Sequence, residues 1–441
     1  MTHEPEYLLV TEYFHPDTAS TGQLMTDLAT GLNDRGLDMT VYTGQPNYHS
    51  GDNERQPTRS LHEGVPVRRI GAPQVRQTSL LRRLVNWAVF TGWMTTLLLF
   101  ERVERERKVV FVTCPPFLPV AMWFVCTVRG WEYTYIAYDL YPDEPAELGY
   151  LPKNGALHQA WEALDRRALL GAAHVVALGP VMKQRITAKG GPSFDAAKIS
   201  VIHNWEDEDF ITPMAKSDNW FSQEHGLDDQ FTVLYSGNIA EFHDLETLVG
   251  AAAELDGADV QFLIIGEGDN KQRIVELAEE HGLRGDAVRF LPYQPWDDLP
   301  YSLTAADVSV VAVKQGFEGI VVSSKLYTAL AAGQPVLTIA KENDDESRIV
   351  TRFDAGIQVE QGAVEEAAAA ITRWTENPEL VDRQGANARE AFEEHFVEDA
   401  SIDRYYEMLA GENDGTVTGG LASPWTTCCS SGAIRSGTTS G

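Results

Sequence analysis

Short apolar runs alternate with longer amphipathic stretches along most of the chain. In the first half the apolar runs, which predict buried strands, lie at residues 7–10, 39–42, 109–113, 134–138, 174–178 and 200–203. Between the first two runs, Leu24, Leu28 and Leu32 recur at helical spacing. A strand, a helix and a second strand in this order predict a βαβ opening, and therefore a parallel sheet with right-handed crossovers.

A second series of the same kind begins after the polar, acidic stretch 213–230. Its expected strands are 231–237, 260–266, 288–291, 308–313 and 335–339, and its expected helices include 245–255, 270–281, 365–374, 378–395 and 400–409. The pattern predicts an α/β protein of two open, parallel-sheet domains, residues 1–213 and 214–398. Residues 411–441 are rich in Gly, Ser and Thr and are expected to form a disordered tail.

Composition limits the partners and the compartment. The 441 residues carry 35 basic and 65 acidic side chains, a net charge of −30, which argues against general binding of nucleic acid. Lysine is scarce, with 10 Lys against 25 Arg, and this acid-rich, lysine-poor balance is typical of a halophile. The chain has four cysteines, Cys114, Cys126, Cys428 and Cys429. They lack the spacing of a zinc site and are too few for a disulfide scaffold, so a reduced, cytoplasmic protein is favoured. The first residues show no signal-peptide pattern.

Two turns between a strand and a helix offer groups to an anion. Thr21 and Gly22 end the loop that follows the first strand, where backbone N–H groups and the positive helix end meet, although an ordinary βα turn reads the same. Gly237 follows the strand 231–237, and Asn238 and His243 add side-chain donors. Neither a G-x-G-x-x-G fingerprint nor a P-loop is present there.

Two further strand ends in the second domain carry lysines. Gly266 and Gly268 flank the end of one strand, and Lys271 follows in the first helical turn. Ser324 or its neighbour at 323 is expected to cap a helix whose first turn contains Lys325, where the charge opposes the helix dipole. Three such sites in one domain predict a phosphorylated ligand at the carboxyl edge of the sheet.

The order of the short motifs along residues 7–410 resembles a GT-B glycosyltransferase of family 4, the retaining group that uses nucleotide-sugar donors. It is also similar to a subgroup that assembles extracellular polysaccharides and surface glycans. The resemblance implies two Rossmann-like domains that face each other across a cleft, with the last helix, 399–410, crossing back to the N-terminal domain. The matching stretches are 13–16, 21–22, 45–48, 139–142, 201–205, 236–238, 244–246, 266–268 and 324–336.

The resemblance assigns the donor to the C-terminal domain. It implies that Gly237 and Asn238 face the pyrophosphate and that Lys271 and Lys325 are its charge partners. Many family members have an arginine at the position of Asn238 and a lysine near His243, so this chain departs from the family at both.

The E-x7-E pattern of the family also degrades in this chain. Its second glutamate, which typically meets the donor ribose, aligns with Thr328, and its first aligns near Ile320. The Ser324–Lys325 pair instead resembles the surface-glycan subgroup. The identities of the donor sugar and base therefore stay open.

Retaining transfer in this fold implies a front-face substitution in which the leaving diphosphate helps to deprotonate the acceptor. Neither a metal nor a cofactor beyond the nucleotide sugar is then expected. Asp139, at a strand end, is the candidate polar residue on the acceptor side, and a capping or turn role fits it equally well. Asp207 and Asp209 form a D-x-D pattern, which arises by chance in so acidic a chain.

One segment runs against the composition. Residues 65–100 contain no Asp or Glu and five Arg, and they end in the uncharged apolar stretch 87–100, which is too short to span a bilayer as a helix. Cationic residues beside an apolar helix with tryptophans predict a segment in the lipid headgroup region, and a buried helix is the alternative. The residues of this predicted membrane surface are Arg76, Arg82, Arg83, Trp87 and Trp93.

Together these features predict a retaining glycosyltransferase, peripheral on the cytoplasmic face of a membrane. It would move a sugar from a nucleotide-sugar donor to a lipid-linked or surface-glycan acceptor. Two alternatives remain open. One is a non-hydrolysing sugar-nucleotide epimerase, which shares the architecture, and the other is a non-catalytic partner that binds a nucleotide sugar or lipid.

Overall fold

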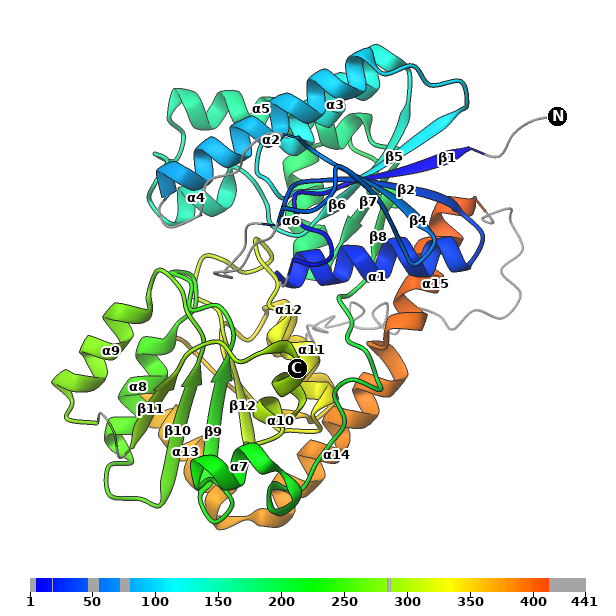
Figure 1. The fold of residues 1–441 in the computed structure, drawn as a ribbon. Coiled ribbons are helices and arrows are strands. Elements are labelled where there is room, and N and C mark those ends of the chain that lie inside the picture. The colour runs from blue at the N-terminus through cyan, green and yellow to red at the C-terminus, as the bar shows by residue number, and fades with distance from the viewer. Residues whose placement is uncertain are drawn as a thin grey trace, which may run out of the picture.

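Two sheets organise the chain, each at the centre of its own α/β domain (Figure 1). The computed structural model describes residues 5–17, 19–46, 55–71, 80–283, 285 and 287–411. The N-terminal sheet has the order β3-β4-β2-β1-β5-β6-β7-β8 and is parallel except for the β3–β4 pair. Its strands are β1 (Glu6–Val10), β2 (Asp38–Thr43), β3 (Arg59–His62), β4 (Val65–Arg69), β5 (Arg107–Val112), β6 (Glu132–Ala137), β7 (His174–Ala177) and β8 (Ile199–Val201).

The helices of this domain cover both faces of the sheet (Figure 1). They are α1 (Ser20–Asp34), α2 (Leu80–Phe100), α3 (Leu118–Arg129), α4 (Asp143–Glu147), α5 (Ala156–Gly171) and α6 (Pro180–Gly190). The predicted Leu24, Leu28 and Leu32 stripe is the buried face of α1. On the opposite side, α3 packs between α2 and α5. Among the described residues, none of the helices is both long enough and apolar enough to cross a bilayer.

The C-terminal sheet is parallel throughout, with the order β11-β10-β9-β12-β13-β14. Its strands are β9 (Phe231–Ser236), β10 (Val260–Ile265), β11 (Val288–Leu291), β12 (Val308–Ala312), β13 (Val336–Ile339) and β14 (Gly356–Val359). The helices are α7 (Trp220–His225), α8 (Leu245–Glu254), α9 (Lys271–Glu280), α10 (Leu299–Leu303), α11 (Lys325–Ala331), α12 (Asp345–Arg352), α13 (Val364–Glu376) and α14 (Pro378–His395). Alternate strand residues fill two cores, because Val233 enters one and Leu234 the other.

The last helix in the described part of the chain, α15 (Glu398–Ala410), packs on α1 of the N-terminal domain (Figure 1). Ile402, Tyr405 and Leu409 are buried in the N-terminal core. The Tyr7 hydroxyl in β1 donates a hydrogen bond to the Leu409 carbonyl at 2.8 Å. Residues from the two ends of the described chain therefore share one core.

The prediction of two parallel-sheet α/β domains is confirmed, but β3, β4 and β14 were not anticipated. The position of β4 changes the interpretation of residues 65–100, the segment with five arginines and no acid. Arg68, in β4, pairs with Glu101 at 2.5 Å, and Arg69 is 5% exposed and donates to Ser60 Oγ at 2.7 Å. Counting both as surface charge was therefore wrong, because one is neutralised by an acid just beyond the acid-free window and the other is buried.

Candidate functional site

Three glycines bring the turns after β9 and β10 into backbone contact. Gly237 has φ +130° and Gly266 has φ +138°, values that favour glycine. A Cβ on Gly266 would collide with the Gly237 carbonyl, and one on Gly268 would collide with the Ile239 carbonyl. The Gly237 N–H already donates to the Ile265 carbonyl at 2.9 Å. These glycines therefore allow the ends of the neighbouring strands β9 and β10 to pack closely. Because Gly237 has no side chain, space is left above its turn.

Lys325 fills the space that Gly237 leaves. A Cβ at Gly237 would lie 2.7 Å from Lys325 Cε. The partly exposed lysine begins α11, and its Nζ lies 5.3 Å from the centroid of the Tyr235 ring. Burial lowers the pKa of Lys325 to about 7, and the nearby Glu346 carboxylate opposes that shift. The Lys325 amine can therefore gain or lose its proton near neutral pH.

His243 lies behind this lysine. The ring is 3% exposed, with Nδ1 2.9 Å from the Tyr235 hydroxyl and Nε2 3.4 Å from Lys325 Nζ. Burial and the Lys325 charge hold the pKa of His243 well below its usual value, so the ring is neutral at physiological pH. The structure places His243 against protein groups on both ring nitrogens.

The other predicted donor-side residues differ in their surroundings. Lys271 Nζ is 2.7 Å from Glu267 Oε1 and donates to the Gly266 carbonyl at 2.8 Å, which makes it a brace for its own turn. Thr328 Oγ1 donates within α11 to the Lys325 carbonyl at 3.0 Å. The Asn238 carbonyl accepts from the Tyr235 hydroxyl at 2.6 Å, and the residue is partly exposed.

The two domains meet beside Lys325. Ser324 Oγ accepts a hydrogen bond from Ser20 Oγ, at the start of α1, at 3.1 Å. Thr21 and Gly22 follow in the first turn of α1 instead of forming a loop, and Gly22 is buried against Tyr13. Thr18, at the start of the predicted loop, lies outside the described residues. The structure therefore brings the predicted acceptor-side segment next to Ser324, with the backbone of Gly22 packed inside.

Asp139 lies at the same interface. It follows β6, its N–H donates to Thr113 Oγ1 at 3.1 Å, and its side chain is partly exposed. Leu140, the next residue, donates from its N–H to the Ile320 carbonyl of the C-terminal domain at 2.9 Å. Burial raises the pKa of Asp139, and the Glu144 carboxylate raises it further. This carboxyl therefore keeps a proton more readily than a surface aspartate.

Sequence reasoning missed the residues that join the domains. Asp345, at the start of α12, accepts hydrogen bonds from the N–H groups of Val181 and Met182 in the first turn of α6, at 2.9 and 3.1 Å. Arg185, also in α6, donates to the Gly316 carbonyl at 3.2 Å and to that of Glu318. Residues 344–346 form an acidic run of the kind usually found in solvent, and they carry no local signal of burial.

The predicted membrane surface is only partly as expected. Trp93 is 47% exposed and Arg82 is exposed, whereas Trp87 is partly buried. Arg83 turns to the C-terminal domain and forms an ion pair with Asp269. Arg76 lies outside the described residues.

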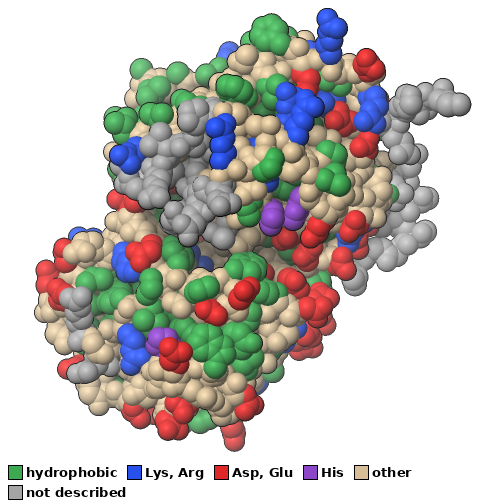
Figure 2. Space-filling view, in the orientation of Figure 1, with side chains coloured by type: hydrophobic (Ala, Val, Ile, Leu, Met, Phe, Trp, Pro, Cys, Tyr) green, Lys and Arg blue, Asp and Glu red, His purple; other side chains and the backbone are tan. Residues whose placement is uncertain are grey.

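Apolar side chains that the sequence did not single out extend this surface from α2 over α3 and α5. Figure 2 shows hydrophobic side chains over the upper left of the N-terminal domain, where Figure 1 places these helices. The large exposed apolar residues of the three helices are Leu81, Leu84, Val85, Trp93, Phe100, Phe124, Val128 and Leu157. Beyond Arg83, α2 carries no charged residue, so its outer face is uncharged along most of its length.

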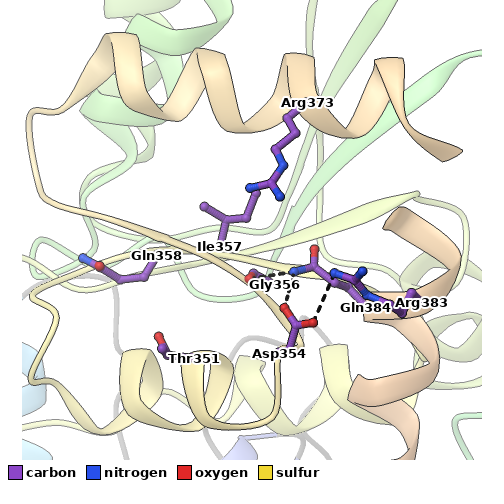
Figure 3. Close-up of a pocket in the computed structure, with 8 residues that line it drawn as sticks. All are labelled: Thr351, Asp354, Gly356, Ile357, Gln358, Arg373, Arg383 and Gln384. Atoms are coloured by element: carbon purple, nitrogen blue, oxygen red, sulfur yellow. Dashed lines mark hydrogen bonds and ion pairs between the residues drawn. The ribbon is translucent and has the colours of Figure 1, made fainter. Parts of the chain in front are cut away.

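A shallow pocket at the outer edge of the C-terminal sheet is a separate feature (Figure 3). Gln384 donates to Asp354 Oδ1 and to the Gly356 carbonyl, each at 3.0 Å, and Arg383 pairs with Asp354 at 3.2 Å. Most of these polar groups form hydrogen bonds or ion pairs with one another around the edge strand β14. The pocket is therefore a feature of the packing at this edge.

Comparison with known proteins supports this architecture. Residues 217–391 match the family described as glycosyl transferases group 1, and residues 21–205 match the glycosyl transferase 4-like domain. The chain is 26% identical over 407 residues to the putative colanic acid biosynthesis glycosyl transferase WcaI of Escherichia coli, covering 90% of this chain and 98% of the relative. It is 22% identical over 286 residues to the probable glycosyltransferase WbjE of Pseudomonas aeruginosa, covering 64% and 70%.

Solved structures share the fold. Sucrose-phosphate synthase of Thermosynechococcus elongatus superposes with a TM-score of 0.71 at 17% identity, over 93% of this chain and 99% of that one. HepE of Anabaena, solved in complex with UDP and glucose, superposes with a TM-score of 0.69 at 15% identity, over 92% and 100%. The chain therefore pairs a glycosyl transferase 4-like domain with a domain of the glycosyl transferases group 1 family, and it has the two-domain GT-B fold of glycosyltransferases.

Proposed function

We propose that this protein is a retaining glycosyltransferase at the cytoplasmic face of a membrane, and that it moves a sugar from a nucleotide-sugar donor to a lipid-linked or surface-glycan acceptor. Residues 1–213 would form the acceptor-side domain, residues 214–398 the donor domain, and residues 399–410 the helix that crosses back. The relative WcaI, described by colanic acid biosynthesis, supports a surface-glycan acceptor. No cofactor besides the nucleotide-sugar co-substrate enters the proposal.

The position of Lys325 carries the proposal. Its amine lies above the Gly237 turn, and the neighbouring Ser324 touches Ser20 of the other domain at 3.1 Å. A diphosphate held by Lys325 would therefore lie at the junction of the two domains, where an acceptor can reach the sugar. HepE, of the same fold, was solved with UDP-glucose, which supports a nucleotide-sugar donor.

The proposed reaction requires electrostatic stabilisation of the leaving diphosphate and correct positioning of the acceptor hydroxyl. In a front-face substitution the bond between the sugar and the diphosphate breaks while the acceptor oxygen forms its bond on the same face, and the leaving phosphate oxygen takes the acceptor proton. Lys325 would stabilise the charge that develops on that phosphate. Asp139, with its raised pKa, would hold the acceptor hydroxyl in place by a hydrogen bond.

The apolar face of α2, α3 and α5 supports a membrane location. Several large exposed apolar side chains on three helices that pack side by side are unusual for a freely soluble protein of net charge −30. Arg82 at the start of α2 adds an exposed cation beside it, suited to anionic headgroups. An acceptor anchored in lipid would then be presented directly to the N-terminal domain.

The proposal is tested by incubating the purified protein with a panel of radiolabelled nucleotide sugars and a membrane lipid extract. We expect label in the lipid fraction, and NMR of the product should show the donor's anomeric configuration preserved. Inverted configuration would overturn the retaining assignment. Conversion of the donor to its epimer without labelled lipid would identify a sugar-nucleotide epimerase, and binding without either product would identify a non-catalytic partner.

Vesicle flotation tests the membrane surface separately. The paired substitution Phe124→Ser and Val128→Ser on α3 should reduce co-flotation with vesicles that contain anionic lipid. The matched control is Trp296→Ser, which removes an exposed aromatic side chain from the C-terminal domain. If the paired variant floated with the vesicles as well as the Trp296→Ser control did, the proposed membrane surface would be wrong.

A further inference from the structure

The Lys325 amine is held from three sides by groups of β9 and the turn after it. Gly237 leaves room for the Cε methylene of the lysine. The centroid of the Tyr235 ring lies 5.3 Å from Lys325 Nζ, and His243 Nε2 lies 3.4 Å from the same atom. A lysine side chain with four rotatable bonds would otherwise sample many positions. The geometry of this pocket therefore reduces the conformational freedom of Lys325.

The hydrogen bonds around His243 indicate which ring nitrogen carries the proton. The Tyr235 hydroxyl has one proton, and its shortest contact, 2.6 Å, is to the Asn238 carbonyl. That hydroxyl therefore accepts from His243 Nδ1 at 2.9 Å, which requires the proton on Nδ1. The Ala240 N–H is aimed at Nδ1 as a competing donor at 3.3 Å, and we assign the proton to Nδ1 on the shorter contact with Tyr235, at 2.9 Å.

With the proton on Nδ1, the lone pair of Nε2 faces Lys325. An ammonium group has three protons to donate, and a bare imidazole nitrogen is an acceptor for one of them. The chain from the Asn238 carbonyl through Tyr235 and His243 thus ends on the Lys325 amine. The other protons of the amine are left to point toward the surface above Gly237.

We propose that His243 is a positioning residue, which fixes the Lys325 amine over the Gly237 turn so that it meets the diphosphate of the donor. This inference rests on the proposed function and adds to it. It assigns His243, which the sequence marked as a direct ligand contact, to the support of the lysine. It also makes Gly237 a requirement for seating the lysine side chain.

The surroundings of Lys325 give the pocket a pH signature. Free Lys325 has a pKa of about 7, with Glu346 of α12 as the acid facing it and Lys314 as a further cation near His243. A diphosphate favours the charged form of the lysine, so its binding above pH 7 takes up a proton. Affinity for the diphosphate should fall as the pH rises through and above 7.

Two substitutions at His243 separate positioning from packing. Asn places its amide where Nδ1 lies but offers nothing at Nε2, whereas Gln reaches the Nε2 position with an acceptor oxygen. Calorimetric titration with inorganic pyrophosphate and with UDP should show roughly tenfold weaker binding for His243→Asn, as expected for a displaced charge-assisted contact. His243→Gln should recover most of that loss and keep the proton uptake above pH 7.

The matched control is His225→Asn on α7, which precedes β9 and therefore lies toward the opposite edge of the sheet. Equal affinities for wild type, His243→Asn and His243→Gln would overturn the inference, and so would equal losses in both variants, because these would indicate packing alone. Crystal structures of both variants give a second measure: Lys325 should leave the Gly237 turn in the Asn variant and stay in the Gln variant. If wild type bound neither probe, the proposed donor site would fail, while the position of Lys325 would still decide the role of His243.

Discussion

At the scale of single residues, the sequence could predict which residues lie at the strand ends, but not the partners of each side chain. Asp139, Gly237 and Lys325 were identified because parallel strands present their carboxyl ends at one edge, and the structure places all three at or beside the domain junction. The roles of Lys271 and His243 depend on what packs around them. Lys271 braces the Gly266 turn and His243 is buried, and neither fact has a local signature in the sequence.

Asp139→Asn tests the acceptor side at this scale. The amide keeps the size of the side chain but cannot match a carboxyl whose proton is retained by burial and by Glu144. We expect kcat to fall by roughly 10- to 100-fold, in the range of one lost positioning or proton-handling group, with the donor KM nearly unchanged. Steady-state kinetics at varied donor and fixed acceptor would show this. Asp256→Asn, at an exposed acid, is the control, and a raised donor KM without a change in kcat would contradict the assignment.

At the scale of elements, hydrophobic periodicity predicted most strands and helices because their apolar faces alternate regularly. It failed for β4, whose arginines resemble a surface segment until Glu101 is seen to pair with Arg68. It failed again for the start of α12, where three consecutive acids are buried because Asp345 caps α6 and Glu346 accepts from the Ser323 N–H at 2.6 Å. Contacts with other elements, which sequence patterns do not contain, decide both cases.

Glu346→Gln tests the energetic cost of that buried acid. Burial and the neighbouring Asp344 raise the pKa of Glu346 well above its usual value. The folded state therefore favours the protonated acid, and stability is lost as the pH rises from the unfolded pKa, near 4, toward the folded one. We expect the variant to be more stable than wild type at pH 8 and to lose this gain toward pH 4. Chemical denaturation at both pH values measures it, and a gain independent of pH would exclude the charge as the cause.

At the scale of the whole molecule, the net charge of −30 and the apolar face of α2, α3 and α5 describe different surroundings. Acidic side chains outnumber basic ones by 65 to 35, whereas the large exposed side chains of this face are apolar, and Figure 2 shows hydrophobic side chains over part of it. The charge was legible from composition alone. The extent of the face was not, because it depends on α3 packing between α2 and α5.

Salt should stabilise the molecule. Self-repulsion among carboxylates opposes the compact state, and it weakens as added ions shorten the Debye length from about 10 Å at 0.1 M to about 3 Å at 1 M. The melting temperature should therefore rise steadily with potassium chloride, as followed by circular dichroism. Sodium chloride at equal ionic strength is the control and should act alike. A flat or falling melting temperature would show that repulsion does not limit stability.

The packing of α15 on α1 has a consequence for how the protein is made. Ile402, Tyr405 and Leu409 belong to the core that β1 begins, and Tyr7 is hydrogen-bonded to Leu409. During synthesis the N-terminal domain emerges from the ribosome first, but its core stays incomplete until residue 410 has left the exit tunnel. The C-terminal domain can close its own sheet earlier. The domain that is translated first is therefore the one that finishes folding last.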